Sequence, residues 1–202
     1  DYDHLMELIN EPEIKSKFRG NNELQNTLGR ILLLSDAAHS FGCSRNGKKI
    51  GATGDITCFS FDGIKNLTSG EGGAIVTKNP EIISRLKDTR LLGVEKDTNS
   101  RFSGERSWLF DVKHQGWRYH MSNIMASIGL AQIDRIEDFR ASRQKIVRKY
   151  LSELQTVEHI RVLELDFEEL LPHIFVVKAA HRDKLREYLD INGIETGLHY
   201  KP

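Results

Sequence analysis

Three short apolar runs between residues 31 and 77 constrain the fold more than any other feature. They are Ile31–Leu34, Ile56–Phe61 and Gly73–Thr77. Their length suits a buried strand, and the last two are rich in the β-branched and aromatic residues that favour strands. Polar residues follow each run at once. These runs therefore predict three strands.

Helical patterns follow these runs. The first lies at residues 79–93, with Asn79 as the expected N-cap, Pro80 at the first helical position and Gly93 as the stop. Two further helical stretches are expected, with a bend near Asp134 to Asp138. Their apolar positions are Ile124, Ile128, Ala131, Ile136 and Phe139, then Ile146, Val147, Tyr150, Leu151 and Leu154. Strands that alternate with helices predict an α/β fold.

The C-terminal stretch reads as a separate α+β unit. We expect a strand at residues 174–180, a helix at 182–192 and a strand at 194–200. This places residues 1–138 in one domain and residues 139–202 in the beginning of another.

Composition excludes several classes of protein. Lys plus Arg and Asp plus Glu each total 29, so the formal net charge is zero. A nucleic-acid or membrane-surface role usually carries a basic excess. No apolar run approaches the roughly 18 residues of a membrane span, and no signal-peptide pattern opens the chain. Cys43 and Cys58 lack C-x-x-C spacing, so neither a disulfide framework nor a metal site is expected. We expect a cytoplasmic protein.

Four reactive residues lie where two of the predicted strands end. Asp36 and His39 follow the first run, and Ser60 and Lys65 lie at the end of the second. In α/β sheets ligands collect at the carboxyl ends of strands, so neighbouring strands would bring these groups to one crevice. Taken singly, each residue has an ordinary alternative: a turn aspartate, a packed histidine, a solvated lysine.

The glycines after Lys65 do not form a nucleotide loop. A Walker A motif needs its lysine after the glycines, whereas Lys65 precedes Gly70, Gly72 and Gly73. A G-x-G-x-x-G fingerprint is also absent. The glycines instead indicate a tight hairpin or bulge with positive φ, which is compatible with a functional lysine.

Three segments carry a family resemblance. In order they are "SDAAHSFG", "GDITCFSFDGIKNLTSGEGGAIVT" and "YHMSNIMASIGLAQI", within residues 35–133. Together they resemble the pyridoxal-phosphate sugar aminotransferases of the DegT/StrS type. The resemblance implies fold type I of the PLP-dependent transferases, the aspartate aminotransferase-like fold. It assigns this chain the second half of the large domain and the start of the small C-terminal domain. Because family members are about twice as long, we expect a partial chain that is not active alone.

The resemblance assigns roles to the four residues at the strand ends. Lys65 matches the lysine that forms the internal aldimine with the cofactor, and Asp36 matches the carboxylate that faces the pyridine nitrogen. His39 lies where the family has glutamine or histidine beside the cofactor ring and its phenolic oxygen. Ser60 matches the serine that binds the cofactor phosphate.

Residues 116–121, "GWRYHM", depart from the family pattern. Many members read G-Y-N-Y-R-M there, with the asparagine reaching the partner subunit's site. Arg118 and His120 replace the asparagine and the arginine. A guanidinium suits a phosphate, so Arg118 is a candidate cofactor ligand.

The chemistry of these side chains suits the implied roles. A lysine forms a Schiff base only through its neutral amine, and once freed it can carry a proton. A carboxylate keeps the pyridine nitrogen protonated, which lets the ring accept electrons. A hydroxyl and turned backbone N–H groups suit a phosphate dianion.

The implied function is transfer of an amino group from an amino acid, with glutamate expected, to a nucleotide-linked keto-sugar. A sugar dehydratase of the same fold is one alternative, but there histidine replaces the lysine, so Lys65 counts against it. A catalytically incomplete scaffold or regulatory relative is the other. The resemblance also implies a homodimer with composite active sites. The apolar face of residues 124–139 could pack in the core or form an interface, and we slightly favour the core. Substrate choice is expected to depend partly on the loop at residues 96–116.

Overall fold

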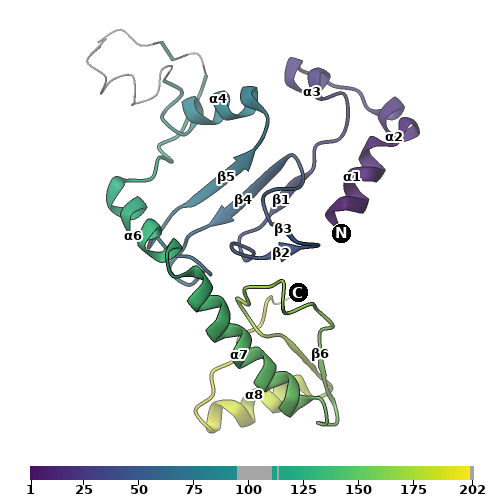
Figure 1. Cartoon of the computed structure of the whole chain (residues 1–202), viewed down its shortest axis with the longest axis vertical. Coiled ribbons are helices and arrows are strands. Elements are labelled where there is room, and N and C mark those ends of the chain that lie inside the picture. The colour runs from purple at the N-terminus through teal and green to yellow at the C-terminus, as the bar shows by residue number, and fades with distance from the viewer. Residues whose placement is uncertain (95–110, 113, 201–202) are drawn as a thin grey trace. The chain divides into compact units, whose positions relative to one another are not determined.

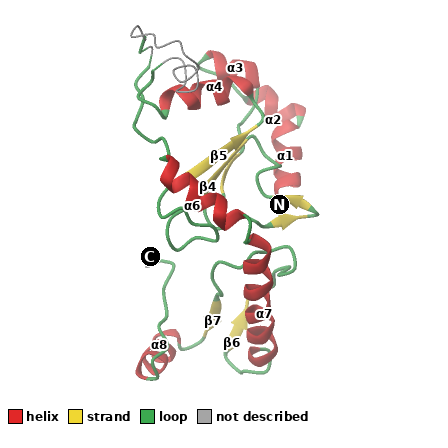
Figure 2. Ribbon diagram, turned by 60° about the vertical axis from the view of Figure 1, so that its left-hand side comes forward, coloured by secondary structure: helices red, strands yellow, loops and turns green. Residues whose placement is uncertain are grey.

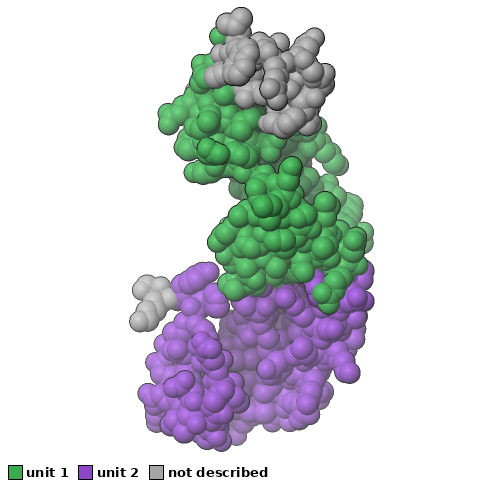
Figure 3. Space-filling model, turned by 90° about the vertical axis from the view of Figure 1, so that its left-hand side faces the viewer, with its two compact units in different colours: residues 1–136 green, residues 137–202 purple. Residues whose placement is uncertain are grey.

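The computed structural model describes residues 1–94, 111–112 and 114–200. The chain divides into two compact units, residues 1–136 and 137–202, which Figure 3 shows in different colours. We describe each unit by itself. The division of the protein into domains after residue 138 stays a prediction.

Unit 1 is built on a three-stranded sheet with the order β1-β4-β5 (Figure 1). β1 (Leu34–Asp36) runs parallel to β4 (Ile56–Ser60), and β5 (Gly73–Thr77) runs antiparallel to β4. All three predicted runs therefore contribute strands to one sheet. With the helices around it, this sheet confirms the predicted α/β class.

β1 begins three residues later than the apolar run predicts. The reason lies at Leu33, whose backbone N–H donates to Asp55 Oδ2 at 2.8 Å instead of to a neighbouring strand. The Asp55 carboxylate is itself held by two hydrogen bonds from Arg30, at 2.7 and 2.8 Å. A part-buried ion pair thus takes the place of ladder pairing at the Leu33 N–H, where the chain enters the sheet.

The helices of unit 1 flank the sheet and the β2–β3 hairpin. They are α1 (Tyr2–Asn10), α2 (Pro12–Lys17), α3 (Glu23–Leu28), α4 (Pro80–Thr89) and α6 (Asn123–Ile133). The hairpin pairs β2 (Ser44–Arg45) with β3 (Lys48–Lys49). The Asn79 side chain accepts from the N–H groups of Glu81 and Ile82, so the predicted cap of α4 is confirmed. α4 ends at Thr89, before the predicted stop at Gly93.

Unit 2 contains the other described elements (Figure 2). These are α7 (Ile136–Leu154), which starts at the last residue of unit 1, β6 (Ile160–Val162), β7 (Val177–Ala179) and α8 (Arg182–Ile191). β6 and β7 pair antiparallel. The interruption between α6 and α7, at Asp134 and Arg135, confirms the predicted bend.

The predicted strand at residues 194–200 is wrong. The Ile194 N–H donates to the Leu189 carbonyl at 2.8 Å, so the start of this segment closes the end of α8. The sheet of unit 2 has two strands within the part of the chain that the structure describes. An extended segment without a strand partner does not become a strand.

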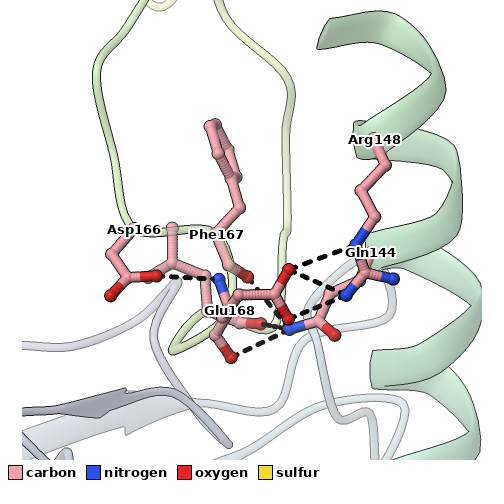
Figure 4. A network of polar contacts seen from close by, with 6 residues as sticks. Gln144, Arg148, Asp166, Phe167 and Glu168 are labelled. Atoms are coloured by element: carbon pink, nitrogen blue, oxygen red, sulfur yellow. Dashed lines mark hydrogen bonds and ion pairs between the residues drawn. The ribbon is translucent and has the colours of Figure 1, made fainter. Parts of the chain in front are cut away.

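A polar network holds the loop after β6 against α7 (Figure 4). Gln144 Nε2 lies 2.9 to 3.0 Å from the carbonyl oxygens of Phe167, Glu168 and Leu170. Arg148 pairs with the Glu168 carboxylate at 2.7 Å. Leu171, the residue after Leu170, is almost completely buried. The network thus fixes residues 167–170 to α7.

The apolar positions of α6 are not core in this chain. Ile124 is 75% exposed and Leu130 is 65% exposed, and Ile128 and Ile133 are also exposed. The preference for core over interface is therefore wrong for Ile124 and Ile128. None of the described helices is long and apolar enough to span a membrane.

Candidate functional site

The candidate site lies at one edge of the unit 1 sheet. β1 and β4 are neighbours and run parallel, so their carboxyl ends meet at the same edge. This meets the condition under which the four residues come together. Asp36 is the last residue of β1 and stands opposite Cys58 in the register, and Ser60 is the last residue of β4. Asp36 is therefore part of the strand, whereas the sequence analysis placed it just after the strand.

The Asp36 carboxylate supplies negative charge at this edge. Its Oδ1 accepts a hydrogen bond from the Ala38 N–H at 3.1 Å, which forms a local turn and leaves the side chain exposed. Burial raises the pKa of the Cys58 thiol, and the nearby Asp36 carboxylate raises that pKa further. Asp36 and Cys58 are register partners in β1 and β4, which places the carboxylate close enough to act on the thiol.

Ser60 begins the loop that connects β4 to β5. Its Oγ accepts from the Asp62 N–H at 3.4 Å, and its Cα partner in β5 is Gly73. The Phe61 N–H donates to the Gly72 carbonyl at 2.9 Å, which closes the mouth of this loop. The hydroxyl is thus held at the end of the strand.

The structure brings Lys65 and His39 into direct contact. Lys65 Nζ lies 2.7 Å from His39 Nε2, although the two residues are 26 positions apart in the sequence. Lys65 lies in a turn in which its own N–H donates to the Asp62 carbonyl at 3.0 Å. Both side chains are half-buried. An amine and an imidazole are therefore paired next to the edge where Asp36 and Ser60 lie.

The residues after Lys65 fix its position. Leu67 and Ser69 are almost completely buried, and Ser69 Oγ donates to the Glu71 carbonyl at 2.8 Å. Gly70 and Gly72 have positive φ, which confirms the predicted glycine turn, whereas Gly73 lies in β5. A Cβ on Gly72 would come within 2.6 Å of Met121 Cε, so this turn is packed as well as bent.

Arg118 does not join this group. Its backbone forms an isolated bridge with Leu91, and its side chain is exposed. Within residues 1–94, 111–112 and 114–200, its guanidinium makes no hydrogen bond or ion pair to Asp36, His39, Ser60 or Lys65. Most of the loop predicted at residues 96–116 lies outside the described residues.

The sequence analysis does not single out Asn66, whose side chain lies against the turn that carries His39. Its side chain is 3% exposed and donates to the carbonyl oxygens of His39 and Phe41, at 3.2 and 3.3 Å. One feature of the sequence could have identified Asn66: it is a polar residue between the reactive Lys65 and the apolar Leu67. Such a position is buried only when its amide finds partners.

The side chains at this edge match the chemical groups of pyridoxal phosphate. Lys65 offers an amine for a carbonyl carbon, and Asp36 offers a carboxylate for a protonated ring nitrogen. Ser60 and the N–H groups of the turned loop offer donors for a phosphate. Across the described part of the chain, no three His, Cys, Asp or Glu residues gather as a metal site.

Comparisons with known proteins show the family of the chain. The profile of the DegT/DnrJ/EryC1/StrS aminotransferase family matches residues 25–202. An uncharacterised protein of Methanocaldococcus jannaschii is 36% identical over 180 residues, which cover 85% of this chain and 46% of that protein.

Two solved structures have the same fold. The putative sugar aminotransferase Spr1654 from Streptococcus pneumoniae, in its PMP form, has a TM-score of 0.89 and 30% identity, and the match covers 100% of this chain and 53% of that one. PseC of Helicobacter pylori, an aminotransferase involved in the biosynthesis of pseudoaminic acid, has a TM-score of 0.76 and 26% identity over 85% of this chain and 46% of its own. The chain thus spans about half the length of the relatives that it matches.

Proposed function

Because this chain belongs to the DegT/DnrJ/EryC1/StrS aminotransferase family, we propose that the protein is a pyridoxal-phosphate-dependent sugar aminotransferase. The observation that carries the proposal is the contact of Lys65 Nζ with His39 Nε2 at 2.7 Å, at the strand edge that Asp36 and Ser60 share. The solved PLP and PMP forms of the pneumococcal relative, at TM-scores of 0.87 and 0.89, support the choice of cofactor.

Each residue has one task in this proposal. Lys65 holds the cofactor through its amine and, once released, moves a proton at the substrate carbon. Asp36 keeps the ring nitrogen protonated by charge pairing. Ser60 donates to the phosphate, and His39 lies beside the ring. When bound, pyridoxal phosphate supplies the electron sink that this chemistry requires.

The acceptor in this proposal is a keto-sugar linked to a nucleotide, and the amino donor is glutamate. The sugar aminotransferases among the relatives support the sugar class. We further propose a homodimer whose partner covers the exposed apolar residues of α6, among them Ile124 and Leu130. An exposed patch of this kind is typical of an interface. Arg118, with its exposed guanidinium, is assigned to the phosphate of a partner's site.

Borohydride reduction tests the role of Lys65. The protein purified with pyridoxal phosphate should absorb as a lysine-bound cofactor does, and reduction should fix the cofactor on the Lys65 peptide. Lys65→Ala should abolish transamination, with a loss of about four orders of magnitude or more, since the amine is both anchor and proton carrier. Lys78→Ala is the matched control, because Lys78 is an exposed lysine that follows β5.

Two results would overturn the proposal. One is a reduced protein whose digest carries no modified Lys65 peptide. The other is a Lys65→Ala variant that transaminates like the Lys78→Ala control. A panel of keto-sugar nucleotides with glutamate as donor then identifies the acceptor, and turnover of none of them would refute the substrate class.

A further inference from the structure

The tip of the β2–β3 hairpin is an Asn–Gly pair. Asn46 and Gly47 connect the two strands, and their φ values are +50° and +71°. A two-residue hairpin turn with both residues in the left-handed region favours this pair of residue types. Both residues are exposed, and a Cβ on Gly47 would meet nothing within 4 Å. The peptide group between them is therefore accessible to solvent.

An Asn–Gly pair can rearrange without any enzyme. The Gly47 backbone nitrogen gives its proton to hydroxide and attacks Asn46 Cγ, so that a new N–Cγ bond forms. The Cγ–Nδ2 bond breaks, and the amide nitrogen takes up a proton and leaves as ammonia. Water then opens either C–N bond of the resulting ring, which gives aspartate or its isomer at position 46. One water enters and one ammonia leaves, and glycine suits the step because no Cβ crowds the ring.

The hairpin is short enough to open and allow this ring closure. Its register contains only the pairs Ser44 with Lys49 and Arg45 with Lys48, and its sheet has two strands. Ring closure requires the backbone of the turn to move. A two-stranded hairpin is marginal by itself, so local opening of this tip costs little free energy.

A second Asn–Gly pair, Asn192–Gly193, is held in place at the end of α8. The Gly193 N–H donates to the Asp190 carbonyl at 2.9 Å, and Asn192 Nδ2 donates to the Tyr188 carbonyl at 2.7 Å. The attacking nitrogen and the leaving amide both lose a hydrogen bond if this pair reacts. Two pairs that look equal in the sequence therefore differ in the structure.

The side chain of Asn46 also helps to hold α1 against the hairpin. Its Nδ2 donates to Asp3 Oδ2 at 3.4 Å, and Lys48 Nζ lies 3.4 Å from Asp3 Oδ1. Arg45 pairs with Asp1 at 3.4 Å. The hydrogen bond from Asn46, followed by the contact with Lys48, lowers the pKa of Asp3. Asp3 is therefore a carboxylate at neutral pH and accepts from an uncharged donor at position 46.

We propose that Asn46 is a site of spontaneous deamidation, and that the carboxylate it produces repels Asp3 and loosens α1 from the hairpin. The reaction replaces the donor that faces Asp3 by a second anion, and like charges at this distance destabilise a contact. Lys48 and Arg45 keep their charges, so α1 is held more weakly and not released. The proposal goes beyond the proposed function, because no residue of the candidate site takes part.

The first test measures both Asn–Gly pairs in one sample. The full chain is incubated at mildly alkaline pH and digested with chymotrypsin, and mass spectrometry follows the exchange of NH₂ for OH at each asparagine. In the folded protein we expect Asn46 to react at least about tenfold faster than Asn192, because the hairpin tip opens more easily than the capped helix end. In the urea-unfolded chain the two rates should converge.

The second test compares Asn46→Asp with Asn46→Gly. The aspartate variant carries the charge of the product, whereas the glycine variant loses the donor, adds no charge and keeps the positive φ. We expect the amides of α1 to exchange their hydrogen at least about threefold faster in Asn46→Asp, and salt should reduce the difference. If Asn46→Asp does not fold, wild-type protein that has been aged until it is deamidated replaces it in this comparison.

Three results would overturn the proposal. Equal rates at Asn46 and Asn192 in the folded chain would show that the hairpin tip is not a preferred site. Unchanged Asn46 under conditions that deamidate the unfolded chain would remove the site altogether. Equal exchange of the α1 amides in the aspartate and glycine variants, at every salt concentration, would show that the new charge does not act on Asp3.

Discussion

Replacing Gln144 by methionine should destabilise unit 2 more than any surface substitution. Methionine has the length and nearly the volume of glutamine but no donor, so it leaves little cavity. The Gln144 side chain is buried, and its Nε2 faces three carbonyl oxygens at 2.9 to 3.0 Å (Figure 4). The variant removes the donor and leaves the acceptors in place.

The expected loss follows from counting donors against acceptors. The amide has two hydrogens, so three carbonyls share two hydrogen bonds. Leaving a buried acceptor unsatisfied costs about 1–3 kcal/mol. Because these bonds are part-buried and Glu168 is exposed, water can reach some of the carbonyls, and we expect a total loss of about 1–3 kcal/mol. The neighbouring ion pair of Arg148 and Glu168 still holds the loop in the variant. Because both side chains are more than half exposed, it contributes at most about 1 kcal/mol to stability. The loss of Gln144 therefore dominates.

Hydrogen exchange read by mass spectrometry is the suitable assay, because it separates unit 2 from unit 1. Amides of α7 and of residues 166–172 should exchange faster in Gln144→Met by a factor that matches this free energy. Gln155→Met is the matched control, since Gln155 is exposed just after α7. If the two variants exchange alike in these segments, the carbonyls do not depend on Gln144 and the reasoning is refuted.

Two further predictions concern charges near the sheet. The hydrogen bonds from Arg30 lower the pKa of Asp55, so the stability from this pair is present above the unfolded pKa of about 3.9 and is lost as pH falls through the folded pKa. Asp55→Asn should cost about 1–3 kcal/mol at neutral pH, because it leaves a part-buried guanidinium without its anion. Urea unfolding across pH should show less acid destabilisation than in the wild type, and an unchanged pH dependence contradicts this. The raised pKa of Cys58 predicts slow alkylation by iodoacetamide at pH 8, and Asp36→Asn should speed it by removing the nearby charge. Equal rates at the Cys58 peptide in both proteins would show that Asp36 does not act on the thiol.

The strands were predictable because each apolar run has the length and residue types of a buried strand. The same pattern could not predict the order of the strands in the sheet, because the spacing of apolar runs does not say which strands pair. Elements of two to six residues, such as α2, α3, β2 and β3, left no usable pattern. Helices this short are marginal alone and depend on contacts that lie elsewhere in the sequence.

The sequence predicts which residues lie at the candidate site better than it predicts how they are arranged. Residue chemistry and strand ends select Asp36, His39, Ser60 and Lys65, and the structure brings Lys65 to His39. The sequence could not show which residue holds the backbone of His39 near Lys65. Asn66 is a polar residue whose importance comes from two carbonyls 25 and 27 positions away.

The glycine-dense segment after Lys65 also connects the lysine to α6. Gly129 is the buried residue of α6, and a Cβ there would lie 3.6 Å from Ser69 Cβ, so the helix and the lysine loop are in contact. Ile124 and Leu130 of the same helix are exposed. The Gly129 contact therefore joins the helix that carries these exposed residues to the loop that carries Lys65. The loop glycines thus supply the turn, while Ser69 in the same loop supplies the contact with Gly129 of α6.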